Sequence, residues 1–165
     1  MAFAAQLTNT GTLSANGGTV ALTTQATQAA LASVINTSGL IEATTVDATP
    51  GHIRLGTATT QQVTVGGNIN VNALAPAAGP GSAEIIGHFV DVTTGARLTA
   101  NAASTGNGGS IIIKGDSTTF RGTAQARGGS TAGDGGFLEI SGHNRLVFAG
   151  AADTLAPHGN LGTLL

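Results

Sequence analysis

The sequence predicts an all-β protein in which successive turns of the chain stack on one another as a β-solenoid. A Gly-apolar phrase recurs after Gly18, Gly51, Gly81, Gly109, Gly136 and Gly159. The second position after each glycine is Val20, Ile53, Ala83, Ile111, Leu138 or Leu161, and the fourth is Leu22, Leu55, Ile85, Ile113, Ile140 or Thr163. Stacked turns point the same positions inward, so they produce such apolar columns.

A second and a third run complete each unit. Small turns at Gly87, Gly115 and Gly142 precede the second run, which covers 88–92, 118–120 and 145–148 and has an earlier counterpart at 62–65. The third run follows Gly11, Gly39, Gly67, Gly122 and Gly150, with Leu13, Ile41, Ile69, Ala124 and Ala152 at its second position. Three short strands per coil predict a triangular parallel β-helix of five to six coils. We expect glycine at the corners because it adopts positive φ without a Cβ clash.

Four stretches are expected to depart from this regularity. The unit at Gly95 is out of register by one residue, which predicts a bulge or an extra turn residue. Residues 24–33, rich in alanine and glutamine, predict a short helix. The loop 73–81 carries Pro76 and Pro80, which lack the ladder donor, so it should project outward. Residues 3–7 predict a second-type strand entered in the middle of a coil.

The composition agrees with a thin, repetitive core. Only 8% of the residues are charged, 26 are glycine, and none is cysteine, tryptophan or tyrosine. A compact enzyme usually has about 25% charged residues, whereas a solenoid turn packs only against its neighbours. A net charge of -2 gives no basic patch for nucleic acid or an anionic membrane. The first residues have no basic segment followed by an apolar one, so they do not resemble a signal peptide.

Three segments resemble a known family. The segments LTNTGTLSANGGTVALTTQA (7–26), SVINTSGLIEA (33–43) and GDGGFLEISGHNRLVFAGAADTLAPHGNLGTLL (133–165) resemble the filamentous haemagglutinin-type passengers of bacterial two-partner secretion. The resemblance implies a right-handed parallel β-helix, secreted or on the outer surface of a Gram-negative cell. It also implies export by an outer-membrane β-barrel transporter. The Asn-Pro-Asn-Leu and Asn-Pro-Asn-Gly motifs that the transporter recognises are absent here.

The carboxylates raise the alternative of a β-helical polysaccharide lyase or glycosidase. Glu84 and Glu139 share one outward column with Ile112 between them, at about the carboxylate spacing of an inverting glycosidase. Arg54 lies one rung from Glu84, which predicts a surface ion pair. The chain offers no aromatic platform for sugars and no long loops to wall a cleft. We therefore expect no enzyme activity and no catalytic residue.

Metal and cofactor sites are not expected either. His52 and His158 lie in separate coils, and His88 and His143 are two coils apart, about 10 Å, which is too far to share zinc. Residues 128–136 half resemble a Gly-Gly-x-Gly-x-Asp calcium repeat but occur once. The threonines occur at turns rather than in the aligned ladder of an ice-binding solenoid. One sequon at Asn36 could accept a glycan.

The sequence therefore predicts that residues 1–165 form a single β-helix segment of a longer passenger protein. Its expected function is structural: a shaft that projects binding regions and mediates adhesion, with a host-cell or glycan ligand. Contact-dependent toxin stalk, haem-scavenging protein and haemolysin remain open. Only the terminal coils expose unpaired strand edges, so end-to-end self-association is also expected.

Overall fold

A computed structural model describes residues 5–24 and 33–165. Every element in these two ranges is a strand. The short helix expected near residues 24–33 falls on residues 25–32, which lie outside the described residues. The all-β prediction is therefore confirmed for the part of the chain that the structure covers.

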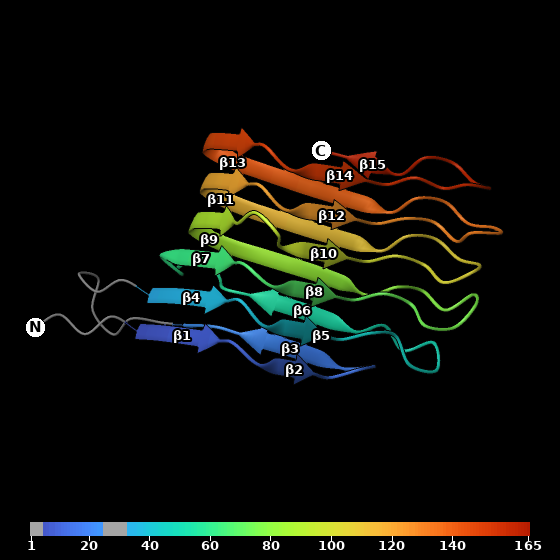
Figure 1. Cartoon of the computed structure of the whole chain (residues 1–165), viewed down its shortest axis with the longest axis horizontal. Coiled ribbons are helices and arrows are strands. Elements are labelled where there is room, and N and C mark those ends of the chain that lie inside the picture. The colour runs from blue at the N-terminus through green and yellow to red at the C-terminus, as the bar shows by residue number, and fades with distance from the viewer. Residues whose placement is uncertain (1–4, 25–32) are drawn as a thin grey trace, which may run out of the picture.

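Fifteen strands are present in the described ranges (Figure 1). In chain order they are β1 Ala5–Asn9, β2 Thr12–Ser14, β3 Thr19–Leu22, β4 Ser33–Thr37, β5 Leu40–Glu42, β6 His52–Leu55, β7 Gln62–Val65, β8 Asn68–Asn70, β9 Ser82–Val92, β10 Arg97–Thr99, β11 Ser110–Phe120, β12 Thr123–Gln125, β13 Phe137–Phe148, β14 Ala151–Asp153 and β15 Thr163–Leu164.

All pairs between these strands are parallel, as a solenoid requires. One sheet has six strands in the order β14-β12-β10-β8-β5-β2, one from each pass of the chain. The other has nine strands and forms two faces of each coil. In β9, β11 and β13 the two faces are one strand that continues through Gly87, Gly115 and Gly142. Three faces per coil and about five turns of a parallel β-solenoid are therefore confirmed.

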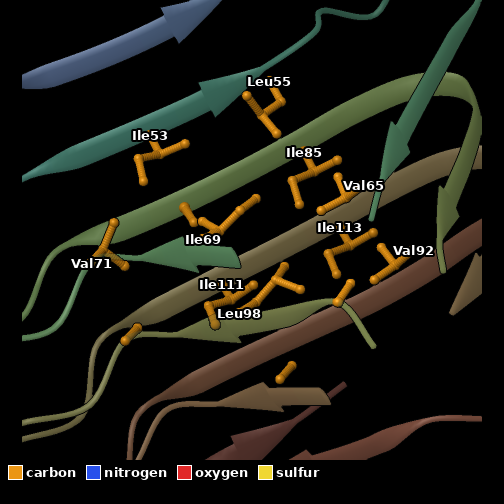
Figure 2. Packing of buried hydrophobic residues seen from close by; sticks show 14 of the residues in the cluster. Ile53, Leu55, Val65, Ile69, Val71, Ile85, Val92, Leu98, Ile111 and Ile113 are labelled. Atoms are coloured by element: carbon orange, nitrogen blue, oxygen red, sulfur yellow. The ribbon is translucent and has the colours of Figure 1, made fainter. Parts of the chain in front are cut away.

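The interior is a narrow column of aliphatic side chains (Figure 2). Ile53 pairs with Ala83, which pairs with Ile111, so the first predicted column is one straight stack. Ile85 and Ile113 form the second stack and are completely buried. Burying a side chain of this size stabilises a fold by about 1.5–3 kcal/mol. Repeated apolar contacts between neighbouring turns therefore hold the solenoid together.

The prediction for the last turn was wrong by three residues. Leu138 pairs with Leu164, not with Leu161, and Leu161 is exposed. The glycine that continues the series is Gly162, which stacks on Gly136, rather than Gly159. Two glycines three residues apart fit the phrase equally well in the sequence, and only the packing of one turn on another distinguishes them.

Most of these repeat glycines are required for a reason other than backbone conformation. At Gly81, Gly109 and Gly136 a Cβ atom would come closer than 3.0 Å to the carbonyl oxygen of the glycine one turn earlier. None of the three has positive φ. Real Cβ atoms essentially never approach backbone so closely. Glycine is needed at these positions because it has no side chain, which lets successive turns approach one another.

Positive φ is used elsewhere, at the irregular turn before β10. Gly95 has φ 90°, and the Ala96 N–H donates to the Thr93 carbonyl over 3.2 Å, closing a β-turn. After this turn Leu98 pairs with Ile69 and Ala124 and stays in its column. Of the two predicted explanations for the register break, extra residues in the connecting β-turn are observed: residues 93–96 join β9 to β10, whereas residues 121–122 join β11 to β12.

Loops at the third corner form a second stacked region, which we call the loop arm: residues 43–51, 71–81, 100–109, 126–136 and 154–162. Figure 1 shows these loops projecting to the same side, one above another. Backbone hydrogen bonds join them, including Ala77 N–H to the Thr105 carbonyl over 3.0 Å and Gly108 N–H to the Asp134 carbonyl over 2.8 Å. The outward projection predicted for 73–81 is confirmed, and other turns share it.

The second strand of each turn changes character along the stack. Near the N-terminal end the inner column holds Asn9 and Thr37, joined by a 3.1 Å hydrogen bond from Asn9 Nδ2 to Thr37 Oγ1. Near the C-terminal end the same column holds Phe120 and Phe148, stacked with ring centroids 5.4 Å apart. Phe148 is partly exposed and lines an apolar hollow of about 190 Å³ with Ile140, Leu146, Leu164 and Leu165.

Candidate functional site

The two candidate carboxylates each pair with a cation on a neighbouring turn. Glu84 Oε2 lies 2.8 Å from Arg54 Nε, the ion pair that the sequence predicts. Glu139 Oε2 lies 3.0 Å from Lys114 Nζ. The sheet register places Ile112 between the two acids. The structure therefore uses both carboxylates in links between turns and does not bring them together.

The histidines lie at separate places on the surface. His88 Nδ1 is 2.6 Å from Asp116 Oδ2 at the corner between the first two faces. His52 Nδ1 is 2.8 Å from Ser82 Oγ on the first face. Within residues 5–24 and 33–165 no three histidine or carboxylate side chains converge as metal ligands would. Each of these contacts joins two adjacent turns through a single pair of side chains.

The half-motif for calcium at residues 128–136 belongs to the loop arm. Asp134 Oδ1 accepts the N–H of Asn160 over 2.8 Å, and the Asp134 N–H donates to Asn107 Oδ1 over 2.8 Å. Calcium needs about six or more oxygen ligands around it. The Asp134 carboxylate is instead one step of a ladder that links three successive loops.

A different set of side chains gathers on the outer face of β8 and β10. Asn68, Asn70 and Asn72 alternate with the buried Ile69 and Val71 and therefore share the outer face. The register pairs Asn68 with Arg97 and Asn70 with Thr99. Asn72 and Asn101, the residues that follow Val71 and Ala100, are joined by a hydrogen bond. We call these six residues, Asn68, Asn70, Asn72, Arg97, Thr99 and Asn101, the asparagine face.

The asparagine face encloses a shallow hollow of about 240 Å³, and Leu40 is the apolar side chain that also lines it. Ligand pockets of proteins usually measure about 300–1,000 Å³ and bury most of a small molecule. This hollow is smaller and lies on the flank of a stack that continues in both directions. It therefore suits part of an extended ligand better than a compact one.

Backbone contacts fix the orientation of two amides in this face. The Asn101 N–H donates to Asn72 Oδ1 over 2.7 Å, and the Arg127 N–H donates to Asn101 Oδ1 over 2.9 Å. Only the carbonyl oxygen of an amide side chain can accept these bonds. The Nδ2 groups of Asn72 and Asn101 therefore remain as donors, and neither donates a hydrogen bond to another described residue.

Arg97 differs from most other cations of the described chain. Arg54, Lys114, Arg121 and Arg127 each lie within 4.0 Å of a carboxylate. Arg97 donates from Nη2 to the neutral Gln125 Oε1 over 2.7 Å, and among the described carboxylates none lies within 4.0 Å of it. Glu42, which lies two strands away from Arg97 in the same sheet, accepts hydrogen bonds from Asn16, Asn70 and Ser14. The guanidinium charge is thus uncompensated at the edge of the hollow.

Sequence reasoning missed the asparagine face because it searched for titratable and metal-binding groups. The signal was present in the alternating Asn68-Ile-Asn-Val-Asn72. Asparagine is depleted in strands, so two on one side of the three-residue strand β8, with a third just beyond it, are unexpected from the fold alone. In this chain Asn70 donates to Glu42 and Asn72 holds the next turn in place, so Asn68 and the Nδ2 group of Asn72 are what remains for a ligand.

Comparison with known proteins assigns no family to this chain. No protein-family model matches the chain, and no significantly similar curated protein is found. The described residues hold no helix with the length and apolar character needed to cross a membrane. The functional argument therefore rests on the stacked architecture and on the groups along its surface.

Proposed function

We propose that this chain is a structural shaft segment of a cell-surface adhesin of the filamentous haemagglutinin type, exported by two-partner secretion. The observation that carries the proposal is the unbroken parallel stack, in which every turn repeats the same three faces. A stack of this kind holds its two ends apart at a fixed distance, with each turn resting on its neighbours. The resemblance of residues 7–26, 33–43 and 133–165 supplies the family and the route of export.

The distribution of charge supports a scaffold. Pairs of opposite charge join successive turns at Arg54 and Glu84, Lys114 and Glu139, Arg121 and Asp91, and Arg127 and Asp153. Each pair lies across a turn boundary and adds a small stabilisation to the backbone ladder. Four hollows on the described surface measure about 190–270 Å³ each, which is small for a catalytic cleft.

The experiment is a test of surface display in the bacterium that encodes the chain. Antibody raised against residues 33–165 should label intact cells, and inactivation of an outer-membrane transporter gene next to the coding sequence should abolish the label. A chain that stays inside cells with a working transporter would contradict the route. The absence of any such neighbouring gene would also count against it.

The enzymatic alternative has its own assay. The purified chain should release no reducing or unsaturated ends from acidic polysaccharides. Release that is lost in Glu84→Gln or Glu139→Gln would show that the carboxylates act on a substrate and would replace the shaft proposal. End-to-end association through the terminal turns stays a prediction, and a strictly monomeric particle in light scattering at high concentration would oppose it.

A further inference from the structure

We propose that the asparagine face is a binding site for an acidic, linear polysaccharide, with Arg97 receiving a carboxylate and Asn72 and Asn101 donating to sugar oxygens. The inference rests on the proposed function in one respect, because a shaft exposed outside the cell meets such polymers directly. The site itself is argued from the hydrogen bonds of the face alone.

The chemistry of the face selects a ligand rich in acceptors. The Nδ2 groups of Asn72 and Asn101 each have two N–H donors, and Arg97 has further N–H groups beyond its bond to Gln125. Asn68 adds an exposed amide on the same face. Hydroxyl, ring and carboxylate oxygens of a sugar acid are acceptors of this kind, and guanidinium binds carboxylate strongly.

Preorganisation strengthens the argument. Asn72 and Asn101 accept backbone N–H groups over 2.7 and 2.9 Å, so their amide planes are held before any ligand arrives. A ligand therefore orders fewer side chains when it binds, which reduces the entropic cost of association. Parallel strands lie about 4.8 Å apart, so the two amides lie one rung apart along the solenoid axis. An extended polymer can contact both.

Other ligand classes fit this surface less well. Protein interfaces are enriched in aromatic residues and methionine at their centres, and the face offers only Leu40 as an apolar side chain, since Ile69 is buried in the core. Nucleic acid binding depends on several cations that neutralise phosphates, and Arg97 is the single cation here. One charge among several amide donors matches a polymer whose acidic groups are separated by neutral oxygens.

The test uses the 16.0 kDa chain and nuclear magnetic resonance of its side-chain amides. Oligogalacturonate is the acidic probe, a neutral β-1,4-glucan oligosaccharide is the control, and galacturonic acid monomer and inorganic sulfate represent small anions. Oligogalacturonate at about 0.15 M salt should shift the Asn72 and Asn101 Nδ2 resonances and the Arg97 Nε resonance. The neutral oligosaccharide and the small anions should shift them less at equal concentration.

Two variants test the assigned contacts. Arg97→Gln removes the charge, and Asn101→Asp keeps an oxygen acceptor for the Arg127 N–H while it removes the amide donor. Each should weaken oligogalacturonate binding about tenfold or more, as expected for loss of a charge-assisted contact. Arg145→Gln is the control for charge, and Asn107→Asp is the control for an asparagine that accepts a backbone N–H elsewhere. Both should bind within about twofold of the parent.

Three outcomes would overturn the proposal. Resonance shifts spread over the whole surface, or equal losses in the variants and their controls, would show unspecific attraction. Equal binding of galacturonic acid monomer or sulfate would limit the site to a small anion, and equal binding of the neutral oligosaccharide would remove the acidic requirement. The assay needs no export, so loss of surface display in cells leaves this result unchanged, and failed binding leaves the shaft proposal unchanged.

Discussion

The inner and outer sides of β8 and β10 are made of alternating residues from the same strands, yet they are under different constraints. Ile69 and Leu98 point inward and pair with residues of the same character in the turns above and below. Asn68 and Arg97 pair on the outside, where packing places no demand on residue type. The residue types of the interior therefore follow from the fold, whereas an unusual residue type on the exterior indicates a role other than folding.

The largest effect is expected from a charge placed in the interior. Ile113→Asp buries a carboxylate without a partner in the aliphatic column and should lower the free energy of unfolding by more than about 4 kcal/mol, or prevent folding. Urea unfolding followed by circular dichroism measures the change. Ile113→Val, the matched control, should cost only about 0.5–1.5 kcal/mol. Unchanged unfolding of the aspartate variant would show that this column does not face inward.

A smaller but clear effect is expected where two turns touch through glycine. Gly136→Ala places a Cβ against the backbone of Gly108 and Gly109, so the turns must separate, at a cost of about 1–3 kcal/mol. Gly79→Ala is the control, because a Cβ there meets nothing within 4 Å. It should be neutral or stabilising by up to about 1 kcal/mol. Equal thermal midpoints for the two variants would contradict the close-approach explanation.

The hydrogen bonds that Asn72 and Asn101 accept from the next turn should each contribute about 1 kcal/mol. Asn101→Ala leaves the partly buried Arg127 N–H without an acceptor and should destabilise by about 1–2 kcal/mol. Asn101→Asp should retain most of the stability because its carboxylate still accepts that bond. Denaturation of both variants at one pH measures the difference. Equal losses would mean that the hydrogen bond to Arg127 is not what Asn101 contributes.

The smallest effects are expected for the ion pairs, and they should differ with exposure. Arg54 and Glu84 have side chains 55% and 35% exposed, so Arg54→Gln should cost at most about 0.5 kcal/mol and depend on salt. Glu139 is only 13% exposed, so Lys114→Gln removes the partner of a largely buried charge and should cost about 1–2 kcal/mol. Unfolding at low and high salt compares the two. A larger loss for Arg54→Gln would reverse this ranking.

The stacked strands could be predicted from the sequence because the apolar residues that produce them recur at regular intervals. Columns such as Ile53, Ala83 and Ile111 follow directly from turns that point the same positions inward. The last turn was assigned wrongly because Gly159 and Gly162 fit the same phrase, and only contact with Gly136 selects between them. The loop arm was predicted at one loop alone, since its hydrogen bonds join residues about 27 positions apart.

The candidate site could not be predicted in full for a related reason. The alternation from Asn68 to Asn72 is visible in the sequence, but the availability of a donor depends on which atom of each amide is already occupied. That depends on the N–H groups of Asn101 and Arg127, which belong to later positions in the stack. The uncompensated charge of Arg97 likewise becomes apparent only when the partners of the other cations are known.

The loop arm has a practical consequence for how this protein can change. Paired strand residues in adjacent turns are 26 to 33 positions apart, and the strands themselves stay in register. Differences in turn length are therefore absorbed at the corners between the strands, outside the columns. Residues 74–77, among them Leu74, lie exposed there, away from the aliphatic interior. A foreign epitope inserted into this loop would be displayed at a fixed position along the solenoid axis, so the position of an epitope could be set by the choice of loop.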